Sequence, residues 1–255
     1  MILTDTHTHQ YYETDSIKRK DLMDRCFENG VSRLFLPNVD AESVSKIITL
    51  VSEYPGHCFP MLGLHPCEVK EEWRAELDKI KEAGSGLKIV AIGEIGIDLY
   101  WDKTTLAFQQ DAFNEQIKWA KELNLPIVIH CRDAFNEVYE VLSSHRGEDL
   151  RGIFHCFSGS AEQAEQVIEL GFYLGIGGVV TYKNAGLDKV VAGIPLQHIV
   201  LETDSPYLTP VPFRGKPNQS SYLTYIAEKI ADLKNISVTE LAEITTVNSK
   251  NIFKV

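Results

Sequence analysis

Histidines and acidic residues stand at the ends of short apolar runs that lie far apart in the chain. The six that could carry chemistry are His7, His9, Glu94, His130, His155 and Asp204. Neutral imidazole and carboxylate groups together suit zinc, manganese, iron or a similar divalent ion. Six ligands are too many for one tetrahedral ion, but they fit a pair of ions about 3.5–4 Å apart, with a carboxylate and a water between them. The pattern therefore predicts a binuclear metal site.

The spacing of single residues supports this prediction. Residues two apart on a strand face the same side, so His7 and His9 can reach one ion. Asp5 shares that parity, and we expect it to support the ligands from behind. By the same alternation Cys131 and Cys156, each one residue after a histidine, should turn toward the helices and be ordinary buried thiols.

Further polar residues near the ends of the runs are candidates for substrate contacts. His65, in the segment Gly63–Pro66, could contact a phosphate or oxyanion, and a loop cap beside a proline is the alternative. Three cations could donate to a phosphodiester, or could simply be solvated: Arg132, Arg214 and Lys216. Glu94 and Asp204 bring two negative charges to the site, so two divalent ions would leave it at about +2, a local trap for phosphate.

The elements that must position these residues are eight apolar runs, which alternate with helix-like stretches. The runs are Met1–Thr6, Ser32–Pro37, Cys58–Leu64, Lys88–Glu94, Pro126–His130, Gly152–His155, Phe172–Gly177 and Ile199–Glu202. Runs of this composition are typical of parallel strands buried on both faces. Eight strand–helix repeats predict an α/β fold, the (β/α)8 TIM barrel, whose strand ends converge on one mouth. The alternative is an open doubly wound sheet, whose glycine-rich first turn is absent at His7–His9.

Composition narrows the class of protein. The chain has 255 residues, a formal net charge of −11 and 44% hydrophobic residues. We expect one domain over residues 1–255, because α/β barrels reach about this length. The excess of acidic over basic residues argues against a broad basic surface that binds nucleic acid. Scattered cysteines without a C-x-x-C pair, and no visible signal peptide or membrane-length stretch, predict a cytoplasmic protein with no membrane contact. We also expect a monomer without an obligate protein partner.

The predicted site favours hydrolysis. A pair of divalent ions activates water and polarises a substrate oxygen. The chain lacks the G-x-S-x-G elbow, so a serine nucleophile has no support. These residues alone leave amide, ester, phosphotriester and phosphodiester bonds open as substrates.

Seven segments, in order along nearly the whole chain, resemble the motifs of the TatD family of metal-dependent deoxyribonucleases, within the amidohydrolase-like TIM barrels. They are Asp5–His9, Gly63–Pro66, Gly93–Asp98, Ile129–Asp133, His155–Gly159, Glu202–Leu208 and Arg214–Lys216. The resemblance implies a cytoplasmic nuclease that removes nucleotides from DNA, in some members with a preference for single strands and 3′ ends. It implies two ion sites that share Glu94, one with His7 and His9, the other with His130 and His155.

The same resemblance places Asp204 at the first ion, where it takes the proton of the attacking water and acts with Glu94 in catalysis. Two segments depart from the family pattern. Gln10–Tyr11 stands where Leu-Asp is frequent, so the contacts of the first loop are open. Asn218–Gln219 stands where Asn-Glu is usual, which removes one negative charge.

Other readings of the site differ in substrate or in activity. A related hydrolase of C–N or phosphotriester bonds often has a carboxylated lysine on the fourth strand, where this chain has Glu94. A polymerase-type PHP phosphoesterase usually extends its first motif with ligands that Gln10 and Tyr11 do not supply. A non-catalytic scaffold would need a defect in the ligand set. The resemblance favours DNA, with RNA as a possible second substrate, and the bound ions could be Zn²⁺, Mg²⁺ or Mn²⁺.

Overall fold

Parallel strands form one continuous sheet in the computed structural model, which describes residues 1–147 and 149–255. Eight strands pair in chain order: β1 (Leu3–Asp5), β2 (Val31–Pro37), β3 (Cys58–Leu62), β4 (Ala91–Asp98), β5 (Ile127–Arg132), β6 (Gly152–Phe154), β7 (Tyr173–Ile176) and β8 (Ile199–Leu201). Backbone hydrogen bonds join the segments around β1 and β8, from Thr6 N–H to Leu201 O and from Asp204 N–H to His7 O, both 3.0 Å. The sheet is a nearly closed barrel, which confirms the predicted TIM-barrel fold.

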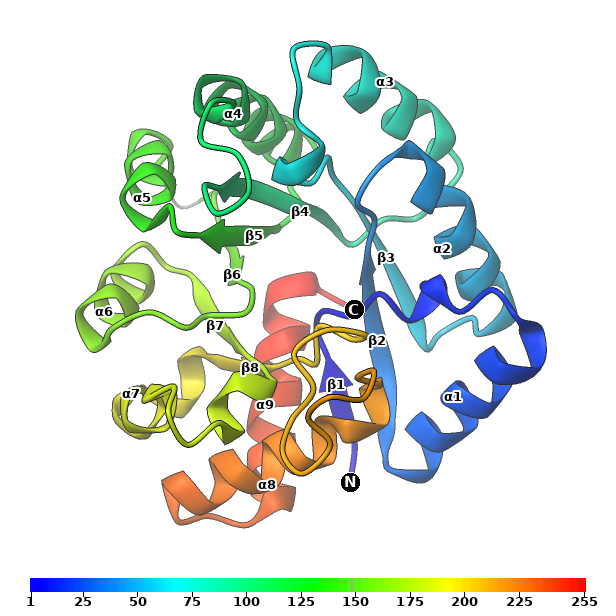
Figure 1. The fold of residues 1–255 in the computed structure, drawn as a ribbon, viewed down its shortest axis with the longest axis vertical. Coiled ribbons are helices and arrows are strands. Elements are labelled where there is room, and N and C mark those ends of the chain that lie inside the picture. The colour runs from blue at the N-terminus through cyan, green and yellow to red at the C-terminus, as the bar shows by residue number, and fades with distance from the viewer. Residues whose placement is uncertain (148) are drawn as a thin grey trace.

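Helices surround the barrel (Figure 1). They are α1 (Ser16–Glu28), α2 (Ala41–Glu53), α3 (Trp73–Ala83), α4 (Leu106–Glu122), α5 (Phe135–Ser144), α6 (Ala161–Glu169), α7 (Leu187–Gly193), α8 (Leu223–Lys234) and α9 (Val238–Phe253). Within the described residues, none of these helices combines the length and the apolar character that crossing a bilayer requires.

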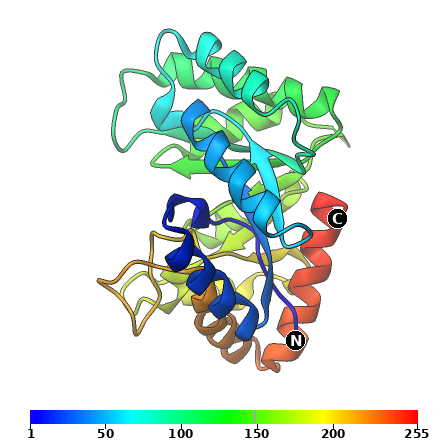
Figure 2. The same cartoon turned by 90° about the vertical axis from the view of Figure 1, so that its right-hand side faces the viewer.

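One end of the barrel is filled by apolar side chains. A core cluster takes buried residues from six of the strands and from the end of α9, among them Phe35, Val128, Ile153 and Val200. Phe253 of α9 stacks on Phe35 with ring centroids 4.0 Å apart. In Figure 2 the long loop after β8 projects from the opposite side of the molecule to α9 and both termini. The carboxyl ends of the strands are therefore the open end.

The alternation of side chains along each strand carries this inward face up to the open end. Val128 lies two residues before His130 on β5, and Ile153 of β6 lies two residues before His155, which directly follows that strand. Side chains two apart share a face of a strand, so the histidines project inward above the apolar layer. The strand pattern that builds the core thus also aims the ligands.

The position of β4 differs from the prediction. We expected a strand over Lys88–Glu94, ending at Glu94, but the strand covers Ala91–Asp98 and Glu94 lies within it. The register with β5 shifts between Ile92 and Ile95, next to Glu94. Glycines let the two strands approach closely, because a Cβ at Gly96 would lie 2.0 Å from the carbonyl oxygen of His130. Glycines at a strand end suggest a turn, and only the pairing with β5 extends the strand past them.

Helix α4 carries two buried glutamines that hold the neighbouring backbone. The amide of Gln109 accepts the N–H of Asp98 (2.8 Å) and donates to its carbonyl (3.1 Å). The amide of Gln116 does the same for Leu64, at 2.6 and 3.3 Å. The two glutamines lie on one face of α4, two turns apart. The helix therefore fixes the end of β4 and the loop that carries His65.

Candidate metal centre

Glu94 lies at the centre of the histidines, with 2% of the residue exposed. Its Oε2 is 3.1 Å from His7 Nε2 and 3.8 Å from His9 Nε2. Its Oε1 is 2.7 Å from His130 Nδ1 and 3.2 Å from His155 Nε2. The two carboxylate oxygens thus face two different pairs of histidines, which is the arrangement a bridging ligand requires.

Asp204 completes the predicted set at the rim of the cluster. Its Oδ1 lies 3.6 Å from His9 Nε2 and 3.8 Å from His7 Nε2, and its side chain is 14% exposed. The residue follows β8 in the left-handed region, with φ 55°. The structure therefore brings all six predicted ligands together, although they come from five strands or the turns that follow them.

The charge states suit a metal site. Burial lowers the pKa of His7, and the nearby His155 lowers it further, so His7 is held in the neutral form that binds metals. Burial alone would raise the pKa of Glu94, but the surrounding histidines, His155 foremost, and the hydrogen bond from His130 hold it well below its ordinary value. An ionised carboxylate therefore sits among imidazoles that can share a cation.

Buried ring nitrogens without a hydrogen-bond partner also indicate a metal site. Neither ring nitrogen of the fully buried His7 has a hydrogen-bond partner among the described residues. Buried polar atoms are normally paired, so such a histidine calls for a ligand. Three groups of side chains place their ligand atoms within 4.8 Å of one another: His7, His9 and Glu94; His65, Glu94 and His130; His7, His155 and Asp204. The residues present therefore fit divalent ions.

His65 lies next to Glu94, in direct contact with the candidate metal ligands. Its Nε2 is 3.5 Å from Glu94 Oε1, and its ring meets that of His130 edge-on, with centroids 4.5 Å apart. Its Nδ1 accepts the N–H of Cys67 at 3.1 Å, which leaves Nε2 facing the site. Because Nδ1 is an acceptor, the neutral ring carries its proton on Nε2, so His65 faces the site as a hydrogen-bond donor, and its contact with a phosphate stays a prediction.

Two acidic residues that the sequence analysis did not single out support histidines from behind. Asp98 Oδ2 is 2.8 Å from His130 Nε2, and although burial would raise the pKa of Asp98, the hydrogen bond from His130 holds it at about 2. Glu202 Oε1 is 3.2 Å from His155 Nδ1 and accepts the N–H of Cys156 at 2.5 Å. A carboxylate behind a ligating histidine fixes its ring and tautomer.

Strand parity could have found both acids. Asp98 lies four residues after Glu94 on the same strand, and Glu202 lies two residues after the inward-facing Val200. On β7, a Cβ at Gly175 would lie 2.1 Å from Glu202 Oε2, so the glycine leaves room for the carboxylate.

The first loop explains one departure from the family pattern. Tyr11 donates its hydroxyl hydrogen to the carbonyl of Pro37 (2.7 Å), so its oxygen accepts from His9 Nδ1 at 2.9 Å. His9 Nε2 is then the free lone pair that faces Glu94. Gln10 accepts the hydroxyl of Ser205 at 2.9 Å. Tyr11 therefore supplies the support that sets the tautomer of His9.

Asp5 acts on the backbone rather than on a ring. Its carboxylate accepts the N–H and the hydroxyl of Thr203, at 2.9 and 2.6 Å, and the N–H of His7 at 3.4 Å. It therefore ties the turn after β8 to the segment after β1. Gln219, the second departure, accepts the Nε–H of Arg25 at 3.1 Å and holds the outer part of the β8 loop.

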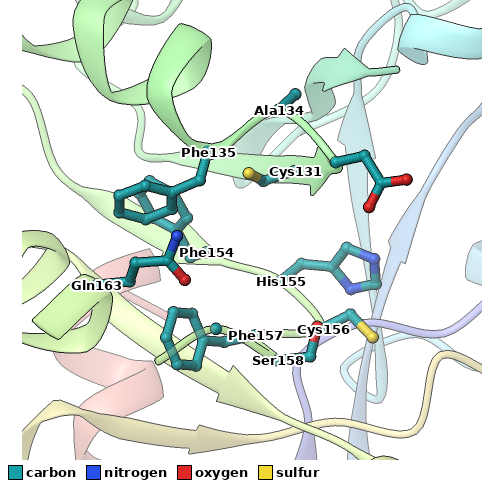
Figure 3. Close-up of a pocket in the computed structure, with 11 residues that line it drawn as sticks. Cys131, Ala134, Phe135, Phe154, His155, Cys156, Phe157, Ser158 and Gln163 are labelled. Atoms are coloured by element: carbon teal, nitrogen blue, oxygen red, sulfur yellow. The ribbon is translucent and has the colours of Figure 1, made fainter. Parts of the chain in front are cut away.

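Cys131 and Cys156, which each follow a candidate ligand, differ in the direction of their sulfur atoms. Figure 3 shows the sulfur of Cys131 pointing away from the imidazole of His155, as predicted, into a cavity of about 290 Å³ beside β5 and β6. The prediction for Cys156 is wrong: its sulfur lies on the same side as that imidazole. The cause is that β6 ends at Phe154 and Cys156 has φ 50°, so strand alternation no longer applies. Among the described residues, the groups that could hold a metal include neither thiol.

The three predicted substrate cations lie in loops after the strands or at a strand end. The guanidinium of Arg132, at the end of β5, lies 3.8 Å from the centroid of the Tyr100 ring. The guanidinium of Arg214 lies 4.0 Å from that of Tyr182. The Lys216 ammonium lies 5.9 Å from the ring of Phe213. Each cation therefore rests on an aromatic ring, and its phosphate contact stays a prediction.

Comparison with known proteins agrees with this geometry. The family model for TatD related DNase matches residues 4–254. The chain is 41% identical to YabD of Bacillus subtilis, named as a metal-dependent hydrolase, over 100% of both chains. It is 32% identical to the 3′-5′ ssDNA/RNA exonuclease TatD of Yersinia pseudotuberculosis, over 91% of this chain and 92% of that protein. The crystal structure of YjjV, a TatD homolog from Escherichia coli, matches with a TM-score of 0.91 and 30% identity over 99% and 98% of the two chains. The protein therefore belongs to the TatD family and is a metal-dependent hydrolase.

Proposed function

We propose that this protein is a deoxyribonuclease that hydrolyses phosphodiester bonds of DNA, as an exonuclease with a preference for single strands. The observation that carries the proposal is the position of Glu94, whose two oxygens face separate pairs of histidines. The exonuclease named TatD from Yersinia pseudotuberculosis, 32% identical, supports DNA as substrate and RNA as a second one.

Two divalent ions, Zn²⁺, Mg²⁺ or Mn²⁺, are the cofactors we propose. His7, His9 and Glu94 would hold one, and Glu94, His130 and His155 the other, with Asp204 at the first. When bound, such a pair lowers the pKa of a water molecule and polarises a phosphoryl oxygen. The buried His7, whose ring nitrogens have no hydrogen-bond partner among the described residues, supports this assignment.

Residues of the chain itself orient the histidine ligands and accept the proton of the attacking water. Tyr11, Asp98 and Glu202 hold the rings of His9, His130 and His155, so the ligands do not reorganise during turnover. Asp204, at the exposed rim, accepts the proton of the attacking water. Arg132, Arg214 and Lys216 would contact the phosphates that flank the scissile bond.

We further propose that residues 1–255 act as one domain and as a monomer, in the cytoplasm. Five free cysteines in the described chain, two of them buried, suit a reducing compartment.

A digestion series tests the proposed function. Metal-loaded protein is incubated with end-labelled single-stranded DNA, duplex DNA and RNA of one sequence, with p-nitrophenyl esters and dipeptides as substrates for the related hydrolases. We expect stepwise shortening of the single strand, which a chelator abolishes and Glu94→Ala reduces by several orders of magnitude. Chelator-insensitive cleavage that is equal in Glu94→Ala would show a contaminating nuclease and defeat the proposal. Hydrolysis of the esters or dipeptides alone would assign the site to another bond.

A further inference from the structure

Two large aromatic side chains are exposed in the loop after β4. Tyr100 is 53% exposed and Trp101 is 71% exposed. Their rings meet edge-on, with centroids 4.9 Å apart. Two adjacent exposed rings together present a larger apolar surface than a single exposed side chain, which needs no functional explanation.

A cation lies on the same surface. The guanidinium of Arg132 is 3.8 Å from the centroid of Tyr100 and 5.7 Å from that of Trp101. Arg132 lies two residues after His130 on β5, so both side chains leave the same face of the strand. The surface therefore offers flat apolar rings next to a planar cation, close to a candidate metal ligand.

Asp98 fixes this surface relative to the metal centre. Its Oδ1 accepts the N–H of Tyr100 (3.0 Å) and of Trp101 (3.3 Å), while its Oδ2 contacts His130. Gln109 holds the backbone of Asp98 through both its N–H and its carbonyl. One carboxylate thus sets both the ring of His130 and the turn that carries the aromatic pair.

We propose that Tyr100, Trp101 and Arg132 form a stacking platform for a nucleobase of a single-stranded nucleic acid, beside the phosphodiester held at the metal centre. Aromatic faces stack on any base, and a guanidinium suits the adjacent phosphate. An unpaired base can leave its stack and reach such a platform more easily than a base in a duplex. The inference rests on the proposed nuclease function and names the feature that selects single strands.

The test separates base recognition from phosphodiester cleavage. Parent, Trp101→Ala and Trp101→Phe are compared on an oligonucleotide and on the same oligonucleotide with abasic residues at its 3′ end. We expect the ratio of kcat/KM for the base-carrying over the abasic substrate to fall about 10-fold or more in Trp101→Ala, in line with the loss of one stacked base. Trp101→Phe should keep most of the ratio. Val247→Ala, which truncates an exposed apolar residue on α9, is the control.

A fluorescence titration provides a second readout. Trp101 is the most exposed of the three tryptophans in the chain. A hydrolysis-resistant phosphorothioate oligothymidylate should quench the tryptophan emission of the parent and leave that of Trp101→Phe nearly unchanged.

The remaining outcomes overturn the inference in distinguishable ways. If the parent cleaves both substrates and Trp101→Ala keeps the parent ratio, the platform is wrong and the nuclease function stands. An equal loss on both substrates would mean that Trp101 only supports the metal centre. A change in oligomeric state on size-exclusion chromatography with an unchanged ratio would make the surface a protein interface. If the parent cleaves neither substrate, the proposed function itself has failed.

Discussion

Glu202 shows how a single buried carboxylate can control the chemistry of a residue it only orients. It is fully buried, and its Oε1 contacts both His155 Nδ1 and the N–H of Cys156. This leaves His155 Nε2 directed at Glu94, 3.2 Å away. Asp98 and Tyr11 act on their own histidines in the same way. The ligand geometry is therefore set one layer behind the ligands.

At the scale of single residues we predict that Glu202→Gln weakens metal binding about 10- to 100-fold, because the amide lacks the negative charge that makes His155 a more basic ligand. Competition with a chromophoric zinc chelator measures the affinity directly. Glu165→Gln, an exposed acid on α6, is the matched control. Parent-like affinity in Glu202→Gln would show that the negative charge of Glu202 does not contribute to metal binding.

Among the helices and strands, β4 has the largest effect on the geometry of the site, because it positions two of its carboxylates. It carries Glu94 within its length and Asp98 at its end, and it packs against β5 so closely that Gly96, at φ 142°, has no room for a side chain. Helix α4 then ties the end of the strand down through Gln109. A shift of this strand would move the bridging carboxylate and one of its supports together.

The corresponding prediction is that Gly96→Ala lowers the free energy of unfolding by about 1–3 kcal/mol, since a Cβ there overlaps the backbone of His130. Urea denaturation followed by circular dichroism gives the value. Gly193→Ala is the matched control, because open space surrounds a Cβ at that position and its φ is not positive, so its effect should stay within about 0.5 kcal/mol. Equal stability of the two variants would contradict the close approach of β4 and β5.

The whole molecule has a formal net charge of −11, so attraction of a polyanion must be local. From the sequence we expected the metal-loaded site to have a net charge of about +2, because only the carboxylates of Glu94 and Asp204 were included. The structure adds Asp98 and Glu202 to Glu94 and Asp204, and four negative charges would bring two loaded divalent ions to about zero. Attraction of phosphate then depends on direct coordination to the metal ions and on the cations at the rim of the site.

We therefore predict a shallow salt dependence for substrate binding. The rim offers Arg132, Arg214 and Lys216, and three phosphate contacts on a single strand give a slope of log Kd against log salt concentration of about 2. Fluorescence anisotropy with a labelled phosphorothioate strand between about 50 and 300 mM NaCl measures the slope. A slope of about 5 or more would require a basic surface that this proposal does not contain.

Much of the fold could be predicted from the sequence. Each of the eight apolar runs overlaps a strand, because parallel strands buried on both faces are rich in apolar residues, although β2, β4 and β5 extend beyond their runs. The errors fall where local signals conflict with pairing. The glycines of β4 suggested an end that the ladder with β5 overrides, and Cys156 leaves the strand alternation because β6 is only three residues long.

The sequence by itself determined the six candidate ligands and the mouth at which they meet, because residue type and strand periodicity are local properties. Tertiary structure alone decided that His65 lies beside Glu94, and that Asp98, Glu202 and Tyr11 support the rings of the other histidines. These relations depend on distances between strands and on contacts between residues far apart in the chain, such as His155 and Glu202, which are 47 positions apart. Such distances follow from how the barrel closes, which no pattern along a single segment records.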